Sequence, residues 1–129
     1  MLDAHLTKST GKAHFLPHAR RALRDAHITT LGILACLSLA ELFNALQMNE
    51  EITLQIITHA QREYRVDLRD ESAPLHVRAI ELYGSVESPP VALLLFMNII
   101  EAEGLEYLER QGITTWGEYR QVYGPLFFE

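Results

Sequence analysis

The stretch Ser38–Val66, SLAELFNALQMNEEITLQIITHAQREYRV, decides the fold because it predicts two helices joined by a very tight turn. Ser38 followed by Glu41 is a capping box, a pattern that begins a helix, and Asn49 can cap the second helix. Apolar residues recur at helical spacing in both segments: Leu39, Leu42, Phe43 and Leu46, then Ile52, Ile56, Ile57, Ala60 and Tyr64. Because the link is so short, the helices must pack together, and we predict an αα-hairpin over residues 38–66.

The same hairpin could be a helix-turn-helix that binds DNA, with its second helix in the major groove. Glu50 and Glu51 argue against this interpretation, because their carboxylates would face the phosphates. The pair also holds Phe43 and Gln47 where DNA-binding pairs usually have a small residue and a glycine, and Thr53 where an aliphatic residue is expected. We therefore favour a packed αα-hairpin and keep DNA binding as the alternative.

Capping residues, prolines and glycines predict further helices on both sides of the hairpin. These signals place a helix from Pro17 to about His27, a short one within residues 28–37, one from Ser72 and Pro74 to Gly84, and a last one that starts at the capping box of Thr115 and Glu118.

The most apolar helix is expected at about residues 89–110. Ser88, Pro89 and Pro90 form a start signal, and Val91–Ile100 is apolar almost all round. A helix without a polar face is surrounded by other helices or shared with a second subunit. The sequence therefore predicts an all-α bundle of about five to seven helices with this helix at its centre.

Length and composition indicate one globular domain. The chain has 129 residues, of which 48% are hydrophobic and 22% charged, so we expect a single helical domain over 1–129 with residues 1–13 as a flexible arm. The longest apolar run, Val91–Ile100, is too short to span a bilayer, and we expect neither secretion nor membrane insertion. Cys36 is the only cysteine, which excludes an internal disulfide and favours a cytoplasmic location.

Charge is unevenly distributed along the chain, whose net charge is -6. Residues 1–28 carry five Lys or Arg and two Asp, a net of +3, whereas residues 29–129 carry six Arg and fifteen Asp or Glu, a net of -9. Three arginines of the basic part, Arg20, Arg21 and Arg24, are expected on the outer face of their helix. This segment could contact a phosphate backbone, or it could lie on the acidic body of its own chain.

Motifs of enzymatic chemistry are lacking: the chain has no Gly-rich phosphate loop, no HExxH and no GxSxG. We therefore expect no enzyme, no cofactor and no metal site. Cys36 lies among aliphatic residues, which favours a buried, inert thiol over a nucleophile. His59 and Glu63 lie one helical turn apart and could share a metal, but a surface hydrogen bond or ion pair explains a lone pair better.

A small acidic helical chain without motifs is typical of a protein that acts through its surface, as an adaptor, inhibitor or regulatory subunit. We predict protein–protein interaction through the aromatic residues near the C-terminus, Trp116, Tyr119, Phe127 and Phe128, with Glu103, Glu106 and Glu109 as a steering face. The apolar tail either folds back onto the body or docks on another molecule. A homodimer is also expected, because the apolar helix and the aromatic tail provide more apolar surface than one small bundle needs for its own core. The alternative is a nucleic-acid-binding regulator that contacts phosphates through Arg20, Arg21 and Arg24.

Overall fold

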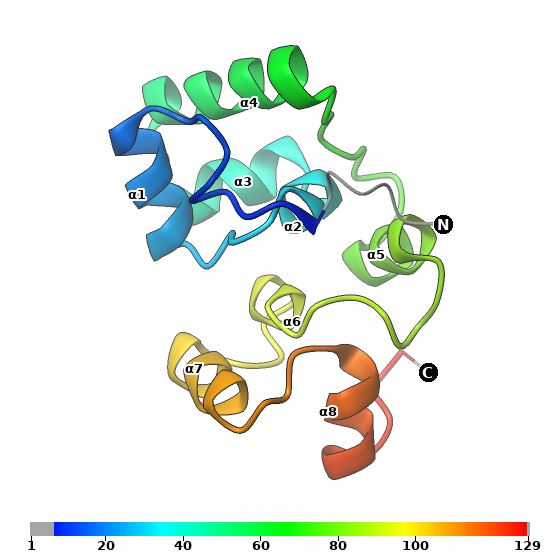
Figure 1. Cartoon of the computed structure of the whole chain (residues 1–129). Helices are drawn as coiled ribbons and strands as arrows, with labels where there is room; N and C mark the ends of the chain where they lie inside the picture. The colour runs from blue at the N-terminus through cyan, green and yellow to red at the C-terminus, as the bar shows by residue number, and fades with distance from the viewer. Residues whose placement is uncertain (1–6, 129) are drawn as a thin grey trace. The chain divides into compact units, whose positions relative to one another are not determined.

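The computed structural model describes residues 7–128, and in this part of the chain it is all-helical, as the sequence predicted (Figure 1). The described residues divide into two compact units, 7–73 and 74–128. No signal near Pro74 predicted this division. The first unit holds α1 (Pro17–Asp25), α2 (Leu31–Cys36), α3 (Leu39–Ala45) and α4 (Glu50–Tyr64), and the second holds α5 (Leu75–Tyr83), α6 (Leu93–Phe96), α7 (Ala102–Arg110) and α8 (Trp116–Tyr123).

The core of the first unit is built around α2, in which all six residues are buried. Thr30 caps this helix by accepting a hydrogen bond from the Ile33 amide at 3.2 Å. Helices α1 and α3 both pack against α4. Their apolar faces complete the core with Ala19, Leu23, Leu42, Ile56 and Ala60, each at most 2% exposed. The short helix expected within residues 28–37 is therefore confirmed.

The predicted αα-hairpin is confirmed in α3 and α4. The Ser38 amide donates to the Glu41 carboxylate at 2.8 Å, and the Glu41 amide donates to Ser38 Oγ at 3.2 Å, which is the expected capping box. Asn49 Oδ1 caps α4 by accepting from the Ile52 amide at 3.0 Å. Thr53 is buried, and its hydroxyl donates to the Asn49 carbonyl at 2.7 Å, so a polar residue fits where an aliphatic one is usual.

Residues 7–13 are tied to the loop between α1 and α2. The Thr10 hydroxyl donates to the Ile28 carbonyl at 2.8 Å, the Thr10 amide donates to the Thr29 carbonyl at 2.9 Å, and Ser9 forms an isolated β-bridge with Thr30. Thr10 is only 3% exposed. These residues belong to the segment expected to be a flexible arm, whereas residues 1–6 of that segment lie outside the described residues.

One continuous apolar helix over residues 89–110 is not formed, and this prediction was wrong. Helix α6 spans only Leu93–Phe96, and α7 begins at Ala102. Asn98 adopts a left-handed conformation with φ of +59°, which ends the helical path, and the Ile99 amide closes a turn onto the Leu94 carbonyl at 3.0 Å.

The proline pair also has a different role from the predicted helix start. Pro90 forms an isolated β-bridge with Thr115, and the Trp116 amide donates to the Pro89 carbonyl at 2.9 Å. The two prolines therefore lie outside a helix, and the start of α8 holds them in place. Helix α8 itself begins at the predicted capping box of Thr115 and Glu118. Within residues 7–128, no helix is long and apolar enough to cross a membrane.

Candidate binding groove between α3 and α4

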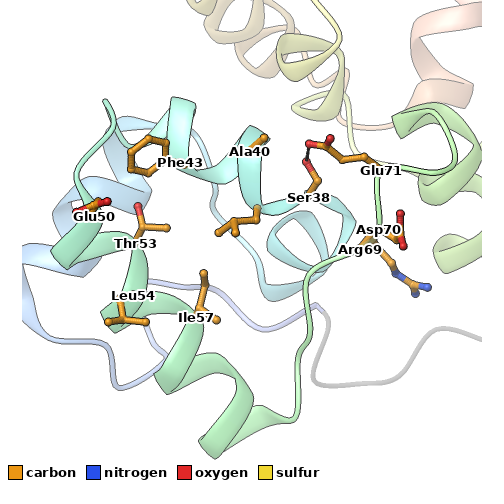
Figure 2. Close-up of a pocket in the computed structure, with 11 residues that line it drawn as sticks. Ser38, Ala40, Phe43, Glu50, Thr53, Leu54, Ile57, Arg69, Asp70 and Glu71 are labelled. Carbon is orange, nitrogen blue, oxygen red and sulfur yellow. Dashed lines mark hydrogen bonds between the residues drawn. The ribbon is translucent and has the colours of Figure 1, made fainter.

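A pocket of about 910 Å³ opens beside the αα-hairpin, and Figure 2 shows its walls. Two sides come from α3 and α4, and the third comes from the chain segment after α4. Its lining residues are Ser38, Leu39, Ala40, Phe43, Glu50, Thr53, Leu54, Ile57, Arg69, Asp70 and Glu71. We call this pocket the α3/α4 groove. It lies entirely within the first unit.

The floor of the α3/α4 groove is apolar and open to solvent. Leu39 and Phe43 lie one turn apart on α3, and Leu54 and Ile57 lie one turn apart on α4. Leu39 is 57% exposed and Leu54 is 66% exposed. The hairpin therefore has two apolar faces, one buried in the core and one that lines the groove. The sequence prediction had assigned Leu39 to the buried stripe, and that assignment was wrong.

The wall after α4 is fixed by hydrogen bonds to the start of α3. The Ser38 hydroxyl donates to Glu71 Oε1 at 2.8 Å while it accepts from the Glu41 amide, and the Arg69 amide donates to the Leu37 carbonyl at 2.9 Å. Ser38 is 1% exposed, so its hydroxyl is anchored in the protein interior, whereas the Glu71 side chain reaches solvent. The groove is therefore largely preformed, as ligand pockets usually are.

The rim of the α3/α4 groove is acidic. Glu50, Asp70 and Glu71 contribute three carboxylates, and Arg69 is the one basic side chain among the described lining residues. In Figure 2, Glu50 lies at one end of the apolar floor, and Asp70 and Glu71 lie at the other end. The charged groups therefore flank the apolar surface and leave its centre uncharged.

A second, smaller pocket of about 330 Å³ lies next to the groove and shares Leu54 with it. His59 lines this pocket and packs on the Phe15 ring, with 4.7 Å between centroids. Its Nε2 atom is buried without a hydrogen-bond partner. His59 is therefore held by aromatic packing, not by the surface contact expected with Glu63, which is exposed.

The predicted aromatic partner residues do not form one exposed surface. Trp116 is completely buried in the second unit, so we correct its assignment and place it in the core of that unit. Phe128 stacks on His76 at 4.4 Å with an interplanar angle of 9°, and it lies 5.2 Å from the Trp116 ring. Phe127 is 75% exposed, and Tyr119 is half-buried. Of the two terminal phenylalanines, Phe128 thus folds back onto the second unit, and Phe127 remains exposed to solvent.

The charged residues singled out in the sequence are all on the surface. Arg20, Arg21 and Arg24 are exposed on α1, where Arg24 pairs with Asp25 at 3.7 Å in solvent. The predicted steering residues, Glu103, Glu106 and Glu109, are exposed on α7. Glu50 and Glu51 are exposed at the start of α4, the helix that would enter the major groove of DNA.

Groups that could support catalysis or metal binding were also located. Cys36 is buried within α2, as expected for an inert thiol. Among residues 7–128, no three His, Cys, Asp or Glu side chains converge on a common point where a metal ion could sit. The pKa of Glu118 is lowered because its carboxylate accepts hydrogen bonds from the backbone and side chain of Thr114, and from Thr115. This carboxylate caps α8.

The α3/α4 groove was not among the sites predicted from the sequence. The available signal was that α4 carries apolar residues on more of its circumference than one buried face needs, since Leu54 lies off the predicted stripe. No family model matches the chain, and no match was found among curated proteins or solved structures.

Proposed function

We propose that this protein acts by protein–protein interaction, as an adaptor, inhibitor or regulatory subunit, and that the α3/α4 groove is its binding surface. One observation carries the proposal: an open, preformed pocket exposes Leu39 by 57% and Leu54 by 66% next to half-buried Phe43 and Ile57. Contiguous exposed apolar surface with a polar rim marks interaction sites on globular proteins. The buried Cys36, the only cysteine of the chain, supports a cytoplasmic location for this activity.

The energetic argument rests on Leu54. Full burial of a leucine side chain is worth about 1.5–3 kcal/mol, and roughly two thirds of that remains to be gained at this position. Covering Leu54 alone would therefore contribute about 1–2 kcal/mol, a factor of about ten in affinity. Leu39 offers a similar gain, so covering both leucines would contribute about 2–4 kcal/mol, and the rest of the affinity would come from other contacts with the groove and its rim.

Affinity capture with matched variants tests this proposal. Leu54→Glu places a charge on the groove floor, while Met48→Glu places the same charge on a residue that is 67% exposed and does not line the groove. We expect proteins captured by the intact chain to be lost with Leu54→Glu and kept with Met48→Glu. If both variants capture the same proteins as the intact chain, the groove is not the interaction surface.

Nucleic-acid binding is a second candidate, favoured by the three exposed arginines on α1. Contacts from Arg20, Arg21 and Arg24 to three phosphates would give a slope of about -3 for log affinity against log salt. Replacing Arg20 and Arg21 with Ala would flatten that slope by about 2. A lack of salt-dependent binding to duplex or single-stranded DNA and RNA at low ionic strength would remove this candidate.

A further inference from the structure

We infer that the partner segment which occupies the α3/α4 groove is a basic amphipathic helix. This inference rests on the proposed function and specifies the chemistry of the partner. The groove presents an apolar floor with carboxylates at both ends, Glu50 at one and Asp70 with Glu71 at the other (Figure 2). A complementary ligand has an apolar centre and basic residues toward both ends.

The shape of the floor favours a helix as the bound element. Leu39 and Phe43 line the groove from adjacent turns of α3, and Leu54 and Ile57 do so from α4, so they form ridges along two packed helices. A third helix can place side chains at positions i, i+3 or i+4, and i+7 between such ridges. The volume of about 910 Å³ is enough for several large apolar side chains.

The charges of the rim select against other occupants. The described lining residues include three carboxylates and one guanidinium, so the rim carries a net charge of -2. A nucleic acid or an acidic helix would be repelled at both ends of the floor. Lysine or arginine side chains are attracted there, and their aliphatic stems can cover apolar surface at the edge of the groove.

Binding of three labelled model peptides of equal length to the full chain, followed by fluorescence anisotropy, tests the inference. One peptide is a Leu/Lys amphipathic helix, the second has the same leucine face with Glu in place of Lys, and the third has the lysines with Ala in place of Leu. We expect the Leu/Lys peptide to bind at least about tenfold more tightly than either of the others.

Charge variants locate the contact. Glu50→Gln with Glu71→Gln removes two rim charges, and the amide oxygen introduced by Glu71→Gln can still accept the hydrogen bond from the Ser38 hydroxyl. Glu51→Gln with Glu63→Gln removes the same charge from exposed positions of α4 that do not line the groove. We expect the rim pair to weaken Leu/Lys binding about three- to tenfold, and the control pair to change it less than about twofold. Thermal unfolding followed by circular dichroism verifies that both variants are folded.

The outcomes separate this inference from the proposed function. Equal binding of the Leu/Lys and Leu/Glu peptides, with both lost in Leu54→Glu, would keep the groove as a binding surface and overturn the basic partner. If the rim variant and the control variant weakened binding of the Leu/Lys peptide equally, the peptide would be attracted by net charge alone, and the basic partner would also be overturned. A dimer of the intact chain that dissociates in Leu54→Glu would identify a second copy as the occupant instead. Failure of all peptides, with capture still sensitive to Leu54→Glu, would overturn the helix but not the groove.

Discussion

Replacing Phe128 with Ala is expected to destabilise the second unit. The Phe128 ring stacks on His76 at 4.4 Å, lies 5.2 Å from Trp116 and lies 5.3 Å from Phe127. Truncation of a fully buried phenylalanine costs about 3–5 kcal/mol, and a favourable aromatic pair contributes about 0.5–1.5 kcal/mol. Because Phe128 is only half-buried, we expect a loss of about 2–3 kcal/mol in the free energy of unfolding.

Phe127→Ala provides the matched control. This residue is the adjacent phenylalanine, and 75% of its surface is exposed, so its truncation removes only its edge contacts with Phe128 and His76. We expect a loss of at most about 1 kcal/mol. The pair of variants thus separates the contribution of the folded-back ring from the general apolar character of the tail.

Urea unfolding followed by tryptophan fluorescence measures both effects, because Trp116 is the only tryptophan of the chain and contacts Phe128 directly. The emission of Trp116 in folded Phe128→Ala should also shift to longer wavelength, because water reaches the indole. Equal unfolding midpoints and slopes for the two variants would refute the argument, since they would show that Phe128 does not pack on the body more than Phe127 does.

Three further predictions rest on local contacts, and a fourth concerns the oligomeric state. Ser38→Ala removes the α3 cap and the bond to Glu71, and should lower the free energy of unfolding by about 2 kcal/mol in urea titrations; an unchanged midpoint would contradict the capping role. Met48→Gly relieves a left-handed φ of +59° at an exposed side chain, and should raise thermal stability by about 0.5–1 kcal/mol, whereas a loss would contradict the observed turn. The pKa of Glu118 is lowered in the folded state, so the ionised carboxylate stabilises the fold at pH values above the ordinary carboxyl pKa. This stabilisation is lost as the pH falls through the lowered pKa of the folded state. In acid titration, the Glu118→Gln variant should therefore lose less folding free energy than the intact chain, and an equal loss would contradict the role of this carboxylate. Light scattering of the intact chain tests the expected homodimer, which requires twice the chain mass of 14.7 kDa.

Helix ends were predictable where the deciding contacts are local. The capping boxes at Ser38 with Glu41 and at Thr115 with Glu118 each join residues three apart, so the sequence contains both partners side by side. Gly84 ends α5 in a left-handed conformation, as the sequence indicated.

The broken helix after Pro89 was not predictable because its cause is not local. The Val91 amide donates to the Thr114 carbonyl at 2.9 Å, and the Trp116 amide donates to the Pro89 carbonyl at 2.9 Å. These contacts join segments more than twenty residues apart and fix residues 89–91 outside a helix, where the pattern favoured a helix start. Asn98 was the one local sign, since asparagine tolerates a left-handed backbone better than most residues.

The α3/α4 groove escaped prediction for a related reason. Periodicity shows which residues share a helix face, but it does not show whether another element covers that face. Leu42 and Ile56 are completely buried, whereas Leu39 and Leu54 have the same chemical character and remain exposed. The acidic wall at Asp70 and Glu71 also depends on how the segment after α4 returns to Ser38.

The complete burial of α2 makes its single thiol a kinetic probe of the first unit. Cys36 is 0% exposed, so a thiol-specific reagent reacts only when that part of the chain opens, and the labelling rate reports the opening equilibrium. Trp116 reports on the second unit by its emission. The native sequence therefore carries one orthogonal reporter in each unit. Labelling and emission recorded in a single urea series would reveal whether the two units open together or in succession.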